Sequence, residues 1–138
     1  MAKPVVQAIV VCDHIYTDRM TGKIVLAGTF ADIISVNFPT NHGNLGIYVA
    51  LTDVSEAGTV RVVFRNENDT DMAFPLPCWK IEKPIDRIAS IELSGNVVGL
   101  PMQCEGQFEF LVLWNDVPIG SRRINLKKLD VPGNLRKE

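Results

Sequence analysis

Apolar and polar residues alternate along much of the chain with a period of two. This pattern is typical of β-strands that bury one face and expose the other. Residues 45–54 place aliphatic side chains at every second position, and residues 59–67 and 89–95 alternate in the same way. We therefore predict a half-buried strand in each of these segments.

Two further segments, residues 5–11 and 108–114, are apolar at both parities. Strands of this kind are usually central in a sheet or covered on both faces. The second segment is followed by Asn115 and Asp116, which both tolerate the positive φ of a type I′ turn. We therefore predict a β-hairpin whose second strand begins at Val117.

The turn at Asn115 and Asp116 also predicts a register for this hairpin. A change of parity further along the second strand predicts a β-bulge near residues 120–121. Before that bulge is introduced, the expected pairs are Trp114 with Val117, Val112 with Ile119, Phe110 with Ser121, and Glu109 with Arg122.

Helix signals are weak, because eight prolines and ten glycines interrupt the chain. The best helical stripe, in residues 78–89, contains Pro84, which would break a helix interior. We expect a loop there with at most one short helical turn. About eight short strands predict an all-β fold, an antiparallel β-sandwich of Greek-key, immunoglobulin-like or C2-like type. Residues 1–138 are expected to form a single domain with a disordered tail at 130–138.

Charge and cysteine content narrow the range of functions. The net charge of −2 is not the basic footprint of nucleic-acid binding, and no segment approaches the length of a membrane helix. We therefore expect neither nucleic acid nor membrane as a partner. The three cysteines are odd in number and form no C-x-x-C pair, which favours three free, mostly buried thiols and a cytoplasmic protein over a zinc site.

The candidate catalytic and binding residues of the N-terminal region lie in the polar stretch that follows the first strand. Gly22-Lys23 lacks the other residues of a phosphate-binding loop, so a turn is expected there. Cys12 and Asp13 are adjacent and point to opposite faces of a strand, so they cannot act as a pair. His14 could meet Cys12 or His42, but two histidines cannot form a three-histidine metal site. We predict no catalytic residue and no cofactor.

An acidic loop at residues 66–71 is the candidate metal site. Glu67, Asp69 and Asp71 alternate with polar residues, and Ca²⁺ prefers several oxygen ligands from one loop. The spacing is not that of an EF-hand. The competing interpretation, which we favour, is a solvated turn between two strands.

Phe38 and Trp79 are the candidate interaction residues, because prolines flank both of them. A partly exposed Trp79 would favour a groove for a protein partner. A buried Trp79 would instead close one end of the sandwich.

The opening of the chain resembles a family of small, uncharacterised bacterial β-sandwich proteins. The resemblance rests on Cys12-Asp13, Thr21-Gly22-Lys23, Leu26-x-Gly28-x-Phe30 and Phe38-Pro39, and on the C-terminal hairpin. It implies a compact β domain in a bacterial cell and no particular activity.

These observations favour a non-enzymatic protein-interaction or assembly module that binds a protein partner or a second copy of itself. Edge strands offer unpaired backbone groups to such a partner. Pro118 blunts one edge, so the first strand or residues 32–37 are the expected contact. One alternative is a ligand- or Ca²⁺-binding sandwich that acts through loop 66–71. The other is an enzyme that uses His14 or His42.

Overall fold

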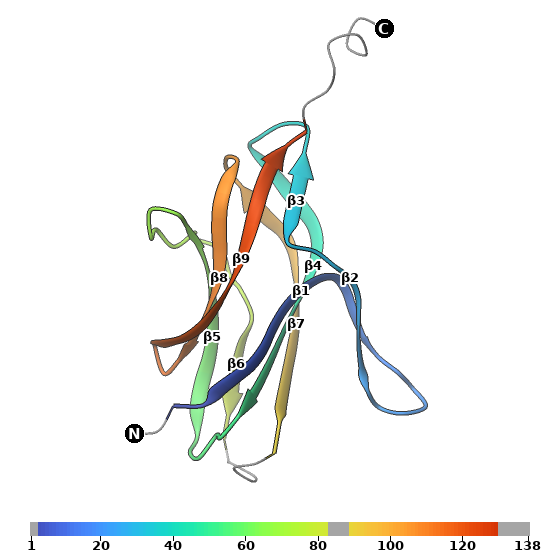
Figure 1. The fold of residues 1–138 in the computed structure, drawn as a ribbon, viewed down its shortest axis with the longest axis vertical. Coiled ribbons are helices and arrows are strands. Elements are labelled where there is room, and N and C mark those ends of the chain that lie inside the picture. The colour runs from blue at the N-terminus through green and yellow to red at the C-terminus, as the bar shows by residue number, and fades with distance from the viewer. Residues whose placement is uncertain (1–2, 83–88, 130–138) are drawn as a thin grey trace, which may run out of the picture.

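The computed structural model describes residues 3–82 and 89–129 and shows two β-sheets packed as a sandwich (Figure 1). The described residues contain no helix, and therefore none with the length and apolarity needed to cross a membrane. The strands are β1 (Val5–Thr17), β2 (Ile24–Thr29), β3 (Asp32–Ser35), β4 (Thr40–Thr52), β5 (Gly58–Asn66), β6 (Cys78–Ile81), β7 (Ile91–Met102), β8 (Gly106–Trp114) and β9 (Val117–Lys128). The predicted all-β sandwich is confirmed.

The chain passes repeatedly from one sheet to the other. The four-stranded sheet has the order β2-β1-β4-β7, and the five-stranded sheet has the order β3-β9-β8-β5-β6. All neighbouring strands are antiparallel except β3 and β9, which are parallel. The expectation of purely antiparallel sheets is therefore wrong for β3, which reaches the second sheet directly from β2 and meets β9 in the same direction.

The core lies between the two sheets, and the alternating residues fill it as predicted. Phe64 of β5 is fully buried and lies against Phe108 and Phe110 of β8, with ring centroids 5.0 and 4.8 Å away. The other parity of β8 is buried too, because Leu111 and Leu113 form a second apolar cluster with Val63. β8 is thus central and covered on both faces, and β1 also lies inside its sheet.

The C-terminal hairpin confirms the predicted turn and corrects its register. Asn115 and Asp116 have φ of 47° and 67°, and Trp114 pairs with Val117. The bulge falls at residue 119, next to Pro118, whose missing N–H interrupts the ladder there. The other three predicted pairs are therefore wrong by one residue: Val112 lies opposite Gly120, Phe110 opposite Arg122, and Glu109 opposite Arg123.

The segment predicted as a loop at residues 78–89 begins instead with strand β6, which pairs with the edge of β5. Trp79 and Ile81 alternate with exposed neighbours and pack toward the core, so period two applies here and not the helical stripe. Residues 83–88, and the tail at 130–138 that we expected to be disordered, lie outside the described residues.

Candidate functional site

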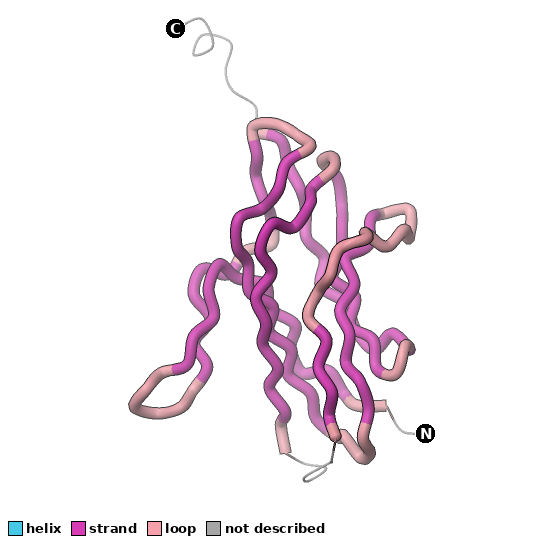
Figure 2. Tube along the Cα trace, turned by 180° about the vertical axis from the view of Figure 1, so that it is seen from behind, coloured by secondary structure: helices cyan, strands magenta, loops and turns pink. Residues whose placement is uncertain are grey.

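A β-hairpin leaves the sandwich and projects beside it (Figures 1 and 2). We call it the arm and define it as residues 14–27, comprising the end of β1, the turn at 18–23 and most of β2. β2 pairs with β1 and with no other described strand. The arm is therefore a two-stranded ribbon in a molecule whose other strands lie in larger sheets.

Asp18 and Thr21, in the polar stretch that follows the first strand, stabilise the turn of the arm. The Asp18 carboxylate accepts hydrogen bonds from the Thr21 hydroxyl and the Met20 N–H, and these bonds lower the pKa of Asp18. Gly22 takes a φ of +74°, and its N–H donates to the Asp18 carbonyl. The predicted turn at Gly22-Lys23 is confirmed.

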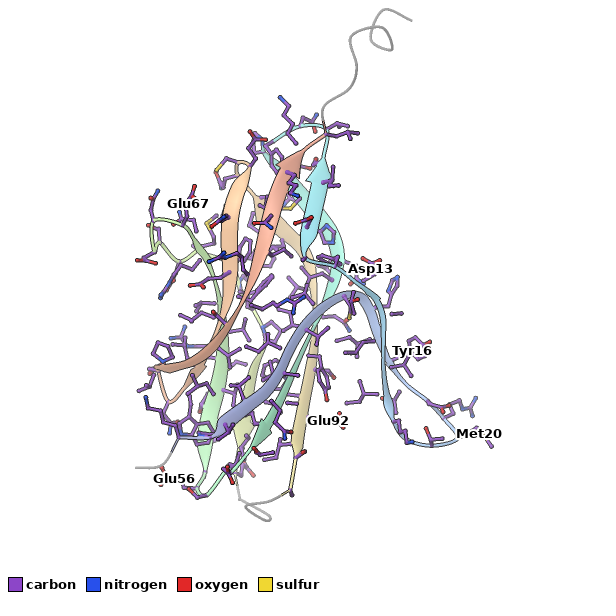
Figure 3. The ribbon with its side chains drawn as sticks, viewed as in Figure 1. Asp13, Tyr16, Met20, Glu56, Glu67 and Glu92 are labelled. Atoms are coloured by element: carbon purple, nitrogen blue, oxygen red, sulfur yellow. The ribbon has the colours of Figure 1, made fainter. Side chains whose placement is uncertain are left out.

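Apolar side chains lie on both faces of the arm, beside the exposed Thr17 on one face and the exposed His14 on the other. The cross-strand pair Ile15–Leu26, with Ile24, lies on one face, and the pair Tyr16–Val25 lies on the other. Tyr16 is 56% exposed, and Met20 at the tip is 91% exposed (Figure 3). A strand ribbon in water normally keeps one polar face. Over most of the length of the arm, no second layer of described residues covers either face.

The arm bends away from the sandwich at a neck formed by Asp13 and Gly28. Gly28 has a φ of +74°, which disturbs the regular ladder between Cys12–Thr29 and His14–Ala27. A Cβ at Gly28 would lie 2.5 Å from the Asp13 carboxylate, so glycine also makes the space that this side chain occupies. The bend of the arm and the position of the Asp13 carboxylate therefore both depend on Gly28.

Cys12 is fully buried at the base of the neck, where Ile15 and Gly46 meet. Its Sγ donates to the backbone carbonyls of His14 and Gly46, at 3.3 and 3.9 Å. Burial raises the pKa of the Cys12 thiol, and the nearby Asp13 carboxylate adds to this rise. These contacts favour a packing role over that of a nucleophile.

A pocket of about 400 Å³ opens beside the neck, between the start of β4 and the edge strand β3. Its lining includes Asp13, Phe30, Asp32 and His42, and it contains no Lys or Arg. Lys127 and Asn125 bind the Asp32 carboxylate, and these bonds, Asn125 first, lower its pKa. Within the described ranges, the Asp13 carboxylate has no ion pair, so this pocket carries an uncompensated negative charge.

The two histidines lie in different surroundings. His14 is exposed on the arm, with its Nδ1 3.4 Å from the side-chain nitrogen of Asn44. His42 is half-buried, lies 6.0 Å from the Phe30 ring, and has a buried Nε2 without a hydrogen-bond partner among residues 3–82 and 89–129. The structure places His42, but not His14, in the pocket with Asp13.

Two of the three acidic candidates of loop 66–71, Glu67 and Asp69, line one pocket with Glu109 and Arg123, and Asp71 does not join them. Asp71 binds Arg65 through a 2.7 Å contact, while Glu67 lies near Gly106. Asn66 uses its side-chain oxygen to accept from the backbone of Asn68 and Thr70. No group of three or more His, Cys, Asp or Glu residues that could hold a metal ion occurs in the described part of the chain.

Phe38 and Trp79 are both half-buried and pack against the core. The indole N–H of Trp79 donates to the Ser94 carbonyl of β7 at 3.2 Å, so Trp79 joins the two sheets along one side of the sandwich. The structure does not bring these two residues into the arm or into the pocket beside it. The sequence predicted the turn at Gly22-Lys23 but not that its hairpin would leave the sandwich, because a run of apolar residues on both parities, as at 24–27, is typical of a covered strand.

Comparisons with known proteins give a family and a distant structural likeness. A family model described as "Family of unknown function (DUF6941)" matches residues 7–127. No match was found among the curated proteins. One similar solved structure is the alkylpurine DNA glycosylase AlkC of Pseudomonas fluorescens bound to DNA containing an abasic site analog. The TM-score is 0.43 and the identity 12%, over 86% of this chain and 30% of that one. A likeness this distant supports no inference about activity.

Proposed function

The chain belongs to the family of unknown function DUF6941, and we propose that it is a non-enzymatic protein-interaction or assembly module whose contact is the arm. The single observation that carries the proposal is that the arm carries apolar side chains on both faces and stands outside the sandwich (Figure 3). A two-stranded hairpin is marginal in water unless further strands or another layer cover it. A protein partner would supply that cover.

The edges of the two sheets also favour the arm. β7 is an edge strand, but it contains Pro101, and Trp79 occupies one of its carbonyls. β3 and β6 are edge strands of four residues each. β2 is a six-residue edge strand without proline or charge, so it offers a longer continuous set of backbone groups for pairing than β3 or β6.

We place this module in the bacterial cytoplasm. Its three cysteines are free thiols, which suits a reducing compartment. The expectation that most of them are buried is wrong, because Cys78 and Cys104 are exposed and Cys12 alone is buried. The bacterial source is implied by the resemblance of the opening motif, in which Asp13 and Gly28 meet at the neck.

The proposal is tested by comparing two variants that carry the same substitution on different edge strands. Val25→Lys places a charge on the arm, and Val98→Lys places one at a 70% exposed position of β7. Tagged native chain and both variants are used as baits in the native cell type, after a chemical cross-linker has fixed existing contacts. Cross-linked partners, including copies of the chain itself, are quantified by mass spectrometry.

We expect Val25→Lys to lower the recovery of the main cross-linked partner by about tenfold, since a charge in an apolar contact is left without compensation. Val98→Lys should leave recovery unchanged. Thermal unfolding of each variant verifies that the sandwich is intact. Equal recovery by all three baits, or no specific partner on any of them, would refute the proposal.

A further inference from the structure

The backbone of β2 shows which of its groups are free to bind. The Lys23 carbonyl accepts a hydrogen bond from Asp18 N–H, so Lys23 faces β1. Successive residues of a strand face opposite sides, so Val25 and Ala27 also face β1 within the arm. Ile24 and Leu26 therefore direct their N–H and C=O groups outward, away from β1.

From this geometry we infer that the arm binds a second copy of this chain, through antiparallel pairing of the two β2 strands about a two-fold axis at Val25. This inference rests on the proposed function and names its partner. In this register, Ile24 and Leu26 of each copy exchange hydrogen bonds with Leu26 and Ile24 of the other. A two-fold interface needs one surface that complements itself, and the outward groups of β2 meet this condition.

The charges of the arm favour a second copy in this orientation. The tip carries Arg19 and Lys23 against the single acid Asp18, and the neck carries Asp13. Antiparallel pairing brings the basic tip of each arm to the acidic neck of the other. β2 itself contains no charged residue, so no like charges oppose each other along the pairing.

The neck pocket lies where the tip of the partner arm would arrive. With the axis at Val25, the partner's Lys23 lies opposite Ala27, so the partner's turn at residues 18–22 extends past Ala27 toward Gly28 and Phe30. Phe30 and Asp13 both line the 400 Å³ pocket. The basic tip of the partner arm therefore ends close to the acidic neck, where Gly28 has no side chain of its own.

Pairing also covers the faces that the single arm leaves open. Two ribbons of two strands become one sheet of four, which is large enough to be stable when it has an apolar face. Ile15, Ile24 and Leu26 of both copies form that face. Because the added contact is a narrow sheet, we expect a dimer with a dissociation constant on the order of micromolar.

The test uses charge reversal in the full chain. Asp13→Lys makes the neck basic, so that it repels the partner's basic tip, and Lys23→Asp makes the tip acidic, so that it repels the partner's acidic neck. Each variant alone should dimerise about tenfold more weakly than the native chain in sedimentation equilibrium at low salt. An equimolar mixture of the two variants should form a heterodimer as tight as the native dimer, because both contacts are then attractive. A general folding defect in the single variants could not be repaired by mixing.

Three results would overturn the inference. The native chain could be a monomer up to about a hundred times the expected dissociation constant. The variant Val25→Lys, in which two lysines would meet on the axis, could dimerise as tightly as the native chain. Or the mixed variants could fail to associate more tightly than either alone. If the native chain is a monomer while Val25→Lys still loses a different cross-linked protein, the inference fails and the proposed function stands.

Discussion

At the scale of single residues, Gly28 determines where the sandwich ends and the arm begins. Its positive φ interrupts the ladder between Cys12–Thr29 and His14–Ala27, and its missing Cβ leaves room for the Asp13 carboxylate. An alanine there would meet both a strained backbone and a 2.5 Å contact. The resemblance noted from the sequence includes Asp13 and Gly28, and their contact gives a physical reason why such residues would occur together.

Tyr48 gives a second prediction at this scale, for stability at high pH. Its hydroxyl donates to Glu92 on the neighbouring strand β7. Burial, and after it the bond to Glu92, raises the pKa of Tyr48 from 10.0 to about 12. The folded state therefore keeps a proton that the unfolded state has released. The stabilisation is complete below a pH of about 10 and is lost as the pH rises through about 12.

We expect the native chain to lose more stability than Tyr48→Phe between a pH of about 9 and about 12 in denaturant titrations. Glu92→Gln is the matched control, since it removes the charge and should reduce the difference only in part. In a Tyr16→Phe background Tyr48 is the sole tyrosine, so phenolate absorbance reports its titration directly. Parallel losses of stability in the native chain and Tyr48→Phe would contradict this assignment.

At the scale of secondary-structure elements, period two predicted the middle of β4, β5 and the start of β7, apolar runs predicted β1 and β8, and the turn residues at 115–116 predicted β9. Period two on its own was not sufficient for β3, whose parallel pairing with β9 depends on contacts between distant segments. It also could not place the bulge at residue 119, because sequence alone does not show where Pro118 interrupts the ladder. Loop 66–71 was identified as polar, but its Arg65–Asp71 pair became visible only in three dimensions.

The backbone N–H and C=O groups of Leu26 point away from β1, and this leads to a prediction for the arm. Proline at residue 26 removes an N–H that faces away from β1, whereas proline at residue 25 removes one that binds β1. We expect Leu26→Pro to keep the hairpin and to abolish association through the edge. Val25→Pro should break the hairpin itself.

Hydrogen exchange measured by NMR on dilute, monomeric samples separates these two outcomes. In Leu26→Pro, the amides of Tyr16 and Val25 should remain protected to the degree seen in the native monomer. In Val25→Pro, protection of the arm should fall, while β4 and β8 stay unaffected. Loss of protection in both variants alike would show that Leu26 does not face outward.

At the scale of the whole molecule, folding and binding use different residues. The buried apolar residues of the core lie in the sandwich, and none belongs to residues 14–27. The sequence predicted the sandwich because burial leaves a periodic pattern. It did not predict the arm as the contact, because the sequence does not distinguish an apolar residue that binds a partner from one that packs in the core. Only the exposure of Tyr16 and Met20, in the arm that stands away from the sandwich, distinguishes them.

This separation predicts that the arm can be shortened without unfolding the sandwich. Replacing residues 17–24 by Asn-Gly would close Tyr16 and Val25 with a type I′ turn and would retain Ile15 over Gly46. We expect the free energy of unfolding of the shortened monomer to stay within about 1 kcal/mol of the native monomer. Phe64→Ala, which cuts into the core, should lower it by about 3–5 kcal/mol.

The shortened chain should also be monomeric, because it has lost Lys23, Ile24 and the tip that reaches the partner's neck. Phe64→Ala, in contrast, should dimerise like the native chain for as long as it is folded, since the arm is untouched. Denaturant unfolding at low concentration and sedimentation equilibrium measure the two properties separately. If shortening the arm unfolded the sandwich, the arm would be part of the core's support, and the division between a folding body and a binding arm would be wrong.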